Sequence, residues 1–337
     1  MKTVVLPGDG TVEVKDVPVP DPGPGEVRIR VRASAICGSD MSALRGDPVV
    51  GGRPGGIVPG HEIAGEVDAL GAGVTGLATG QRVAIHLAVG CMRCEYCRAG
   101  YLMLCTEVRI IGFQLPGGDA EYMVVPAVNC LPLPDELGYV EAAVATDMFG
   151  TQFSAQHRLG VSGTDRVTVF GLGPTGAAAV GVARARGARV FAVDPVEHRR
   201  ELGIAMGADG VFASDDDLRD ALTSEGNRGA DVVIECSGNR GAQVAALEVV
   251  RPLGRVAFVG ESREVAINPS GHLLRPMTTV IGAWYFPIWQ FEAIARFLVD
   301  TKMPIDTIVS HRLSLDDAPD AFRMLTERSA EKMVFEL

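Results

Sequence analysis

Four of the seven cysteines in this 337-residue sequence lie close together and have side chains that can bind a metal ion. They follow the spacing C-x2-C-x2-C-x7-C and are Cys91, Cys94, Cys97 and Cys105. Four thiolates complete the tetrahedral shell of Zn²⁺ and leave no position for a substrate. Free buried thiols and disulfides are the alternatives, but cysteines this close in sequence are strained as disulfides and common in metal sites. The spacing therefore predicts a structural zinc ion, which stabilises the fold without taking part in catalysis.

A second set of possible metal ligands is spread over two segments. Cys37 begins the sequence Cys-Gly-Ser-Asp, and His61 and Glu62 end the glycine-rich segment 53–62. A thiolate, an imidazole and a carboxylate can hold Zn²⁺ while one position stays open for water or a substrate. Single cysteines and histidines are more often buried structural residues, so the residues alone leave both interpretations open.

A glycine-rich turn in the middle of the chain has the pattern of a dinucleotide-binding site. Its residues are Gly171, Leu172, Gly173, Pro174, Thr175 and Gly176. The first glycine permits the tight turn, the second lets backbone N–H groups approach a pyrophosphate, and the third lets helix and strand pack closely. An expected strand at 167–170 precedes the turn, an expected helix at 177–186 follows it, and a second strand at 189–193 ends in Asp194. This order predicts a βαβ unit that binds a dinucleotide.

Asp194 indicates which dinucleotide is bound. A carboxylate at this position can accept both hydroxyls of the adenosine ribose, and it would repel a 2′-phosphate. The sequence therefore predicts NAD. NADP stays an alternative because Arg199, which we include among the candidate cofactor-binding residues, or Arg200 could pair with a phosphate.

Length and composition set the broad class of the protein. A chain of this length is expected to form two domains, and 47% hydrophobic with 22% charged residues is usual for a soluble globular protein. The net charge is −11 and the basic residues are scattered, so nucleic acid is not an expected partner. The first apolar run ends at Pro7 and no window is long enough for a membrane span, so we expect a cytoplasmic protein.

The elements that must position these side chains change character along the chain. Up to about residue 147, short β-rich runs alternate with Gly and Pro, which predicts mainly antiparallel strands at 12–17, 26–33, 62–68, 81–86 and 120–125. From about residue 148 to 287, strands alternate with helices, which predicts a doubly wound parallel α/β sheet. The expected strands there are 167–170, 189–193, 210–212, 231–236, 255–260 and 279–283. Helices at 289–300 and 315–327 and a strand at 332–336 are expected to return to the first domain.

The order of these motifs resembles the zinc-dependent medium-chain alcohol dehydrogenase family over essentially the whole chain. The resemblance rests on Cys-Gly-Ser-Asp, then Gly-His-Glu, then the four-cysteine segment, then the glycine-rich turn with its acid. It implies a GroES-like catalytic zinc-binding domain from residues 1–148 and 288–337. It also implies an NAD-binding Rossmann domain from residues 149–287.

The resemblance also implies the roles of particular residues. Cys37 and His61 would bind a catalytic zinc ion, and Glu62 would bind it or lie just behind it. Asp147 would be the further ligand. Together with the structural ion at the four cysteines, each chain would then hold two Zn²⁺ ions. Asp40 would hold the free N–H of the histidine ligand.

The family mechanism implies a path for the alcohol proton. Zinc lowers the pKa of the alcohol, whose carbon delivers hydride to nicotinamide, and Ser39 takes the proton toward the nicotinamide ribose. The relay of the family often ends in a histidine three residues later. This sequence has Ser42 there, which has no pKa near neutrality, so water or another group must accept the proton.

Two further segments have more than one interpretation. The aromatic run 283–289 is expected either to pack in the core or to line the substrate cleft. In this family a strand at the end of the nucleotide-binding domain often pairs across a two-fold axis. Residues 279–283 are the candidate, and a homodimer or homotetramer is the expectation.

The combined motifs predict a zinc-dependent oxidoreductase that moves hydride between NAD and a small-molecule secondary alcohol. The resemblance favours a polyol, cyclitol or amino alcohol. One alternative is an NADPH-using reductase of the same superfamily that acts on a ketone, imine or enone. Another is a nucleotide-binding sensor without catalytic activity.

Overall fold

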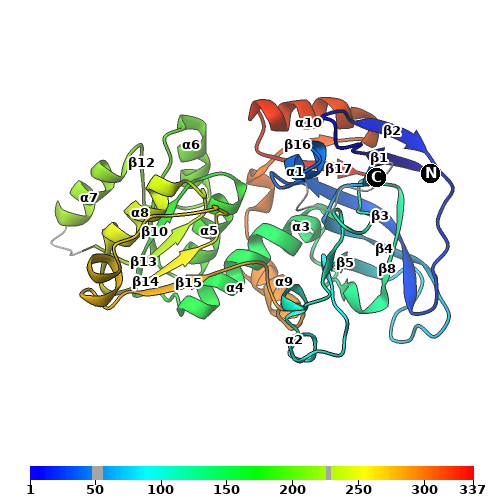
Figure 1. Cartoon of the computed structure of the whole chain (residues 1–337), viewed down its shortest axis with the longest axis horizontal. Helices are drawn as coiled ribbons and strands as arrows, with labels where there is room; N and C mark the ends of the chain where they lie inside the picture. The colour runs from blue at the N-terminus through cyan, green and yellow to red at the C-terminus, as the bar shows by residue number, and fades with distance from the viewer. Residues whose placement is uncertain (48–55, 225–228) are drawn as a thin grey trace. The chain divides into compact units, whose positions relative to one another are not determined.

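A computed structural model describes residues 1–47, 56–224 and 229–337. The chain forms two compact units, which Figure 1 shows coloured along the sequence. The first unit contains residues 1–147, 286–300 and 309–337, and the second contains residues 148–285 and 301–308. The chain therefore returns to the first unit after Tyr285, and residues 301–308 belong to the second unit.

The first unit is built on a seven-stranded sheet. Six of its strands have the order β16-β17-β3-β4-β5-β9, and β8 also pairs with β3. The strands are β3 (Glu26–Ile36), β4 (Glu62–Leu70), β5 (Arg82–Ile85), β8 (Tyr122–Pro126), β9 (Cys130–Pro132), β16 (Val309–Leu313) and β17 (Lys332–Glu336). The pairs are antiparallel except for β16 with β17. This confirms the predicted antiparallel β domain.

Alternating side chains on β3 explain how this sheet forms its core. Val27, Ile29 and Val31 are buried, whereas Arg28, Arg30 and Arg32 between them are more exposed. Successive side chains point to opposite faces of a strand, so one face of β3 packs inside while the other meets solvent. The buried face forms one hydrophobic cluster with apolar residues of β4, β5 and β8.

Smaller elements complete the first unit. Two short sheets pair β1 (Lys2–Val5) with β2 (Glu13–Asp16) and β6 (Ala88–Val89) with β7 (Arg109–Ile110). The helices are α1 (Asp40–Leu44), α2 (Glu95–Arg98), α3 (Tyr139–Val144), α9 (Phe291–Asp300) and α10 (Ala318–Glu327). Short 3-10 helices are η2 (Leu102–Leu104), η3 (Ala127–Asn129), η6 (Ile288–Gln290) and η8 (Leu315–Asp317).

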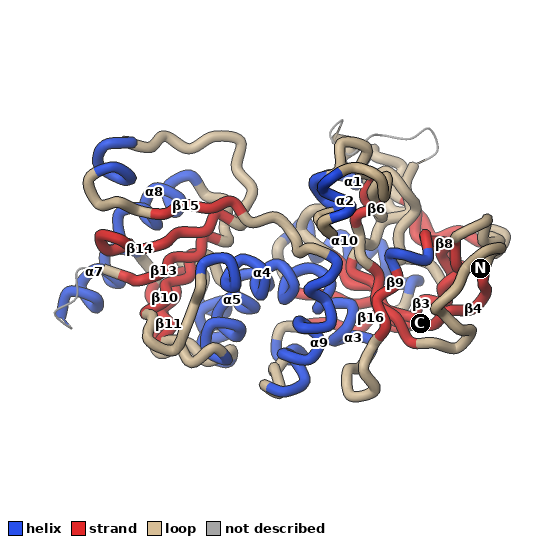
Figure 2. The backbone as a smooth tube through the Cα atoms, turned by 90° about the horizontal axis from the view of Figure 1, so that it is seen from below, coloured by secondary structure: helices blue, strands red, loops and turns tan. Residues whose placement is uncertain are grey.

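The second unit is the predicted doubly wound α/β domain with a six-stranded parallel sheet. Figure 2 shows β15, β14, β13, β10 and β11 side by side, and the full order is β12-β11-β10-β13-β14-β15. The strands are β10 (Arg166–Phe170), β11 (Arg189–Val193), β12 (Gly210–Phe212), β13 (Ala230–Glu235), β14 (Val250–Phe258) and β15 (Thr279–Gly282). The helices are α4 (Gly150–Leu159), α5 (Pro174–Ala185), α6 (Glu197–Ala205), α7 (Asp215–Ser224) and α8 (Arg240–Val249), with short turns η5 (Pro269–Leu274) and η7 (Ile305–Thr307). The strand order reverses between β10 and β13, and dinucleotides bind at such a point.

Several elements differ from the sequence expectations. Helix α5 begins at Pro174, three residues early, because Gly173 is extended and the fixed backbone angle of proline suits the first helical position. Helices α3 and α4 and strand β16 have no counterpart among the expected elements. Their apolar runs are short and irregular, so periodicity alone cannot separate helix from strand there.

Within the described residues, none of the helices has the length and apolar character needed to cross a membrane.

Candidate active site

The fold brings together four potential metal ligands that are far apart in the sequence. Cys37 follows β3, His61 and Glu62 lie at the start of β4, and Asp147 lies in the π-helical turn η4 (Ala145–Phe149). One ligand atom from each side chain lies within 4.8 Å of the others. Single π-helical turns are rare and frequently occur at functional sites.

The spacing of the four side chains suits a single ion. Asp147 Oδ2 lies 3.8 Å from Cys37 Sγ and 3.7 Å from His61 Nε2. Zn–S and Zn–N bonds of about 2.3 and 2.0 Å place tetrahedral ligands roughly 3.3–3.8 Å apart. The donor set of sulfur, nitrogen and carboxylate oxygen is also the one that zinc prefers. The residues present therefore fit a zinc ion.

Glu62 is held at the cluster by a buried lysine. Lys332 Nζ, from β17, donates to Glu62 Oε1 at 2.6 Å and to the carbonyl of Ile36 at 3.2 Å. Burial alone would lower the pKa of Lys332, but the Glu62 carboxylate outweighs it and raises the pKa above its usual value. Within the described part of the chain, Glu62 Oε2 is buried and has no hydrogen-bond partner. A bound cation would satisfy this oxygen.

Asp40 supports His61 from the side away from the cluster. Its Oδ1 lies 3.2 Å from His61 Nδ1, and its Oδ2 accepts the backbone N–H of Cys37 at 2.8 Å. Burial disfavours the charged imidazole and by itself would lower the pKa of His61. The charge of the Asp40 carboxylate and a hydrogen bond between His61 and Asp147 outweigh burial, so the pKa of His61 lies well above its usual value. Asp40 therefore orients the ring so that Nε2 faces the other ligands.

Ser39, the expected proton acceptor, and Ser42, which stands where the family relay often has a histidine, lie next to each other at α1. Ser39 precedes α1 and is exposed, and its Oγ lies 3.4 Å from His61 Nε2. Ser42 lies within α1, and its backbone N–H donates to the carbonyl of Ser39 at 3.0 Å. The structure therefore places Ser39 beside the cluster. Residue 42 is also a serine, so it offers no group that titrates near neutral pH.

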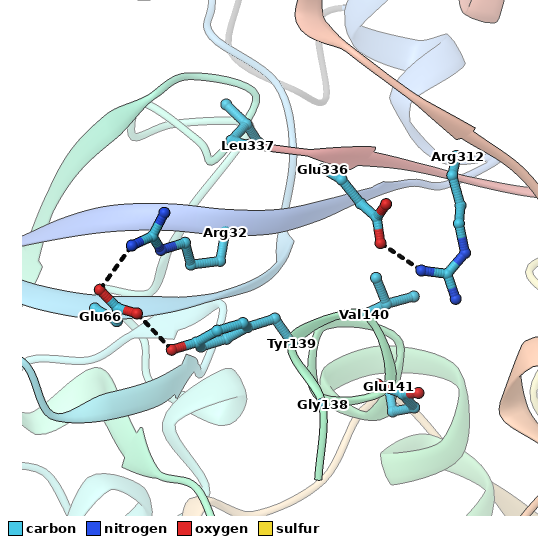
Figure 3. Close-up of a pocket in the computed structure, with 9 residues that line it drawn as sticks. All are labelled: Arg32, Glu66, Gly138, Tyr139, Val140, Glu141, Arg312, Glu336 and Leu337. Carbon is cyan, nitrogen blue, oxygen red and sulfur yellow. Dashed lines mark hydrogen bonds and ion pairs between the residues drawn. The ribbon is translucent and has the colours of Figure 1, made fainter.

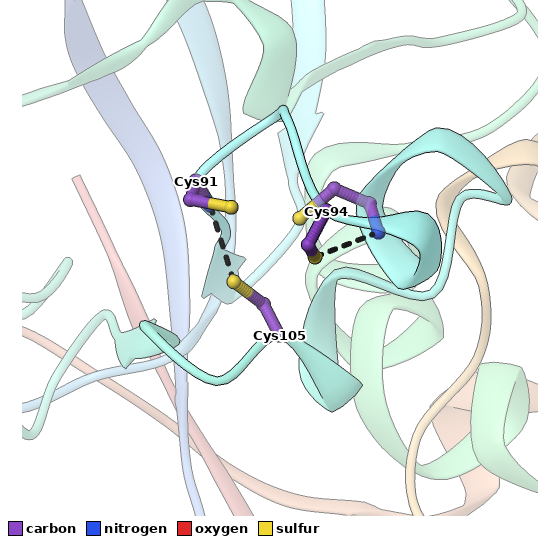
Figure 4. A group of neighbouring side chains, drawn as sticks. Cys91, Cys94 and Cys105 are labelled. Carbon is purple, nitrogen blue, oxygen red and sulfur yellow. Dashed lines mark hydrogen bonds between the residues drawn. The ribbon is translucent and has the colours of Figure 1, made fainter.

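The four-cysteine segment folds into a second cluster, three members of which are labelled in Figure 4. The sulfur atoms of the four cysteines lie within 4.8 Å of one another, and none of the four forms a disulfide. The residues are Cys91, Cys94, Cys97 and Cys105. Backbone N–H groups of Cys91 and Cys97 donate to the sulfurs of Cys105 and Cys94 at 3.3 and 3.4 Å. The N–H groups of Arg93 and Cys94 lower the pKa of Cys91 to about 6. Such hydrogen bonds favour thiolates, which are the form that binds zinc.

Glycine occupies the three glycine positions of the dinucleotide turn for different structural reasons. Gly171 has φ +83, which favours glycine, and a Cβ on Gly176 would lie 1.7 Å from the carbonyl oxygen of Gly171. A Cβ on Gly173 would meet nothing within 4 Å. Packing therefore requires Gly176, whereas the space at Gly173, at the start of α5, is open to an anion such as a pyrophosphate.

Asp194 directly follows β11 and lies beside this turn. It is buried, and its two carboxylate oxygens accept the backbone N–H groups of Leu172 at 2.7 Å and Val196 at 2.9 Å. Arg200 donates to the carbonyls of Asp194 and Pro195, both at 2.8 Å. Arg199 is half-buried in the first turn of α6. The carboxylate is thus fixed against the glycine turn.

Sequence reasoning missed two buried ionisable residues near the four potential metal ligands. Lys332 is one, and Asp119 is the other. Asp119 is fully buried and accepts the hydroxyl of Ser34 at 2.6 Å, and its burial, with the nearby Asp40, raises its pKa to about 7. Neither residue lies in a motif, and a lysine or aspartate in a strand or loop usually indicates an exposed position.

The first unit also has a separate cavity of about 600 Å³, shown in Figure 3. Four of its charged side chains form ion pairs: Arg32 donates to Glu66 at 3.0 Å, and Arg312 pairs with Glu336. Tyr139 donates to Glu66 at 2.7 Å. None of the four clustered ligands lines this cavity, so we do not assign it to the candidate active site.

The aromatic run 283–289 contains both buried and exposed rings. Tyr285 and Phe286 are buried, and the carbonyl of Phe286 lies 3.1 Å from His86 Nε2. Trp284 and Trp289 are 53% and 57% exposed. Core packing therefore accounts for Tyr285 and Phe286, and contact of the run 283–289 with a substrate stays a prediction.

A parallel sheet with a dinucleotide turn and a cluster of Cys, His and carboxylate side chains are together typical of metal-dependent, nicotinamide-linked oxidoreductases. Residues 23–135 match the alcohol dehydrogenase GroES-like domain, and residues 174–300 match the zinc-binding dehydrogenase domain. The chain belongs to the zinc-dependent medium-chain alcohol dehydrogenase family, which confirms the resemblance.

Individual relatives agree with this assignment. An uncharacterized zinc-type alcohol dehydrogenase-like protein of Escherichia coli is 34% identical over 99% of each chain. The L-threonine 3-dehydrogenase of Pyrococcus abyssi is 33% identical over 90% of this chain and 89% of its own. Among solved structures, an alcohol dehydrogenase from Thermus sp. ATN1 has a TM-score of 0.92 and 31% identity, covering 100% of this chain and 99% of its own.

Proposed function

We propose that this protein transfers hydride between a secondary alcohol and NAD at a zinc ion bound by Cys37, His61 and Asp147, with Glu62 as a ligand or directly behind it. The observation that carries the proposal is the convergence of these four side chains within 4.8 Å, with a buried, unpartnered Glu62 oxygen among them. The sulfurs of the four-cysteine cluster support a second, structural zinc ion.

The chemistry follows from the site and its neighbours. Zinc held here would act as a Lewis acid and lower the pKa of an alcohol hydroxyl toward neutrality. Ser39, exposed and beside His61, accepts the alcohol proton while it passes its own hydroxyl proton to water, because Ser42 cannot store a proton. Asp40 keeps the imidazole of His61 oriented throughout.

The second unit supplies the NAD-binding site of the proposal. Gly173 and the start of α5 receive the pyrophosphate, and Asp194 receives the adenosine ribose. The buried position of the Asp194 carboxylate supports NAD, because it would repel the 2′-phosphate of NADP. The half-buried Arg199 and Arg200 are the residues that could admit NADP.

A polyol, cyclitol or amino alcohol is the proposed substrate class. The similarity to an L-threonine 3-dehydrogenase supports the amino alcohol within this class. We also propose a cytoplasmic location, with the zinc-binding and NAD-binding roles divided between residues 1–148 with 288–337 and residues 149–287. The competing functions are an NADPH-using reductase and a sensor without catalytic activity.

Replacement of Cys37 by serine tests the metal assignment. The Cys37→Ser protein should hold one zinc ion in place of two and bind NADH normally. Its turnover should fall by at least about a thousandfold, since Lewis-acid stabilisation contributes several kcal/mol. Cys130→Ser, at a buried thiol in β9, is the matched control and should keep both ions. Retained turnover in Cys37→Ser would contradict the assignment, and a wild-type chain that loads only one zinc ion would favour the sensor.

A substrate panel separates the remaining alternatives. Zinc-loaded protein is supplied with NAD⁺ or NADP⁺ and with secondary alcohols, sugars, cyclitols and 3-hydroxy amino acids, and absorbance of the reduced nicotinamide is followed. We expect reduction of NAD⁺ with one of these classes. Activity only in the reverse direction, with NADPH and a ketone, imine or enone, would instead support the reductase.

A further inference from the structure

Glu235 is a buried carboxylate at the end of β13 that binds the turn following the strand. Its side chain is 0% exposed, whereas Ser237 and Asn239 in the turn are exposed. Glu235 Oε1 accepts the N–H and the hydroxyl of Ser237, the N–H at 2.7 Å. The N–H of Gly238 donates to both oxygens of Glu235, at 3.0 and 3.2 Å. A buried acid therefore determines the conformation of an exposed turn.

This arrangement fixes more of the backbone than an ordinary turn does. The Ser237 hydroxyl accepts the N–H of Asn239 at 3.1 Å, and Asn239 accepts the N–H groups of Gly241 and Ala242 at the start of α8. The hydrogen bonds thus run without a break from Glu235 to α8. Burial raises the pKa of Glu235, whereas the N–H and hydroxyl groups of the turn, which donate to its oxygens, stabilise the carboxylate charge.

The turn 236–239 lies where the strand order of the sheet reverses. A Cβ added to Gly171 would lie 2.8 Å from Ser237 Cβ, so the two turns that follow β10 and β13 are in direct contact. On the other side, a Cβ on Gly260, after β14, would lie 2.1 Å from the backbone nitrogen of Gly238. Dinucleotides cross an α/β sheet at this point, with one nucleotide over each half.

We propose that Glu235 is a positioning residue for the nicotinamide half of the dinucleotide and acts through the turn 236–239. The inference rests on the proposed function, since it requires that the second unit binds NAD. Asp194, at the end of β11, marks the half of the sheet that receives adenosine. Glu235 ends β13, which is the first strand of the other half. The two acids therefore act on opposite ends of one cofactor.

The test compares the affinity for the whole cofactor with the affinity for its adenosine end. Zinc-loaded wild-type and Glu235→Gln proteins are titrated with NADH and with 5′-AMP. Glutamine keeps the size of the side chain but puts an NH₂ group where an oxygen accepts hydrogen bonds. We expect the Kd for NADH to rise about tenfold, because a misplaced buried donor disturbs the turn. The Kd for 5′-AMP should stay within about twofold.

Two further variants complete the design. Asp194→Asn should weaken binding of both 5′-AMP and NADH, in contrast to Glu235→Gln. Ser237→Ala removes only an exposed hydroxyl, so it should fold even if Glu235→Gln does not, and it should raise the Kd for NADH about threefold with 5′-AMP unchanged.

The outcomes separate the inference from the proposed function. Equal weakening of NADH and 5′-AMP in Glu235→Gln would show a merely structural role and overturn the inference. Unchanged NADH binding in both Glu235→Gln and Ser237→Ala would also overturn the inference. The proposed function would stay intact in that case, provided that the wild-type protein binds NADH. A wild-type protein that binds neither ligand would instead contradict the proposed function itself.

Discussion

At the scale of single residues, Glu62, one of the four potential metal ligands of the first unit, is paired with a lysine from the end of the chain. Lys332 is 3% exposed and donates to Glu62, the ligand candidate that is itself fully buried. Two opposite buried charges are tolerated because each offsets the desolvation of the other, whereas removal of one leaves the other uncompensated. Lys332 therefore affects both the stability of the fold and the position of Glu62.

Replacement of Lys332 by methionine should separate this pair. We expect the free energy of unfolding to fall by about 3–5 kcal/mol, because Glu62, whose pKa burial already raises to about 8, would lose the buried cation that offsets its desolvation. Zinc content should also fall, from two ions toward one. Lys15→Met, which breaks an exposed pair with Glu13, should change stability by less than about 1 kcal/mol. Denaturant unfolding and metal analysis measure both effects, and a Lys332→Met protein as stable as Lys15→Met would contradict this account.

At the scale of elements, the unit β10–turn–α5 shows that glycines of one motif are required for different reasons. Gly176 lies where the start of α5 contacts the carbonyl of Gly171, so a side chain cannot fit. Gly173 caps α5 in an extended conformation, with φ −61 and ψ 179, which any residue can adopt. Its lack of a side chain therefore serves no contact within the described chain and supports a role in cofactor binding.

Alanine at each of these two glycines should have a different effect. Gly176→Ala should lower the free energy of unfolding by about 3 kcal/mol, since the added methyl group would overlap the backbone oxygen of Gly171. Gly173→Ala should fold with a loss below about 1 kcal/mol but raise the Kd for NADH at least tenfold, because the methyl group fills the pyrophosphate position. Thermal unfolding and NADH titration distinguish the two. Normal NADH affinity in Gly173→Ala would argue against the assigned pyrophosphate site.

At the scale of the whole molecule, the parallel sheet of the second unit has an open edge. Strand β15 pairs with β14 on one side, and among the described residues no strand pairs with its other side. Ile281 is half-buried there, and Leu253, Leu274 and Met277, near the start of this edge, are 63–70% exposed. Unpaired strand edges and exposed apolar side chains favour association with another chain. These features support the predicted homodimer or homotetramer.

A charge on the edge strand should block this association. The wild-type protein is expected to have a mass in solution of two or four times the 35.5 kDa of one chain. Ile281→Lys should lower the mass, because a lysine on an edge strand prevents pairing with a second strand. Val19→Lys, at an exposed apolar residue of the first unit, is the control and should leave the mass unchanged. Light scattering measures the mass, and an unaltered oligomer in Ile281→Lys would exclude β15 as the interface.

The sequence by itself determined the features that depend on local spacing. The glycine turn at 171–176, the strand that ends at Asp194 and the cysteine spacing are each contained in a short segment, so backbone sterics and ligand geometry suffice to interpret them. Alternation of buried residues likewise predicted β3, and the order of strands and helices predicted the parallel sheet. The family resemblance added Asp147, which no local pattern marks as a ligand.

Only the tertiary structure decided which distant residues meet. It brought Cys37, His61 and Asp147 within 4.8 Å, placed Lys332 behind Glu62, and buried Glu235 beneath the turn that contacts Gly171. Such contacts depend on strand pairing and register across the whole chain, which local propensity does not specify. A buried lysine or glutamate looks the same in sequence as an exposed one, because its burial is a property of the neighbours that folding supplies.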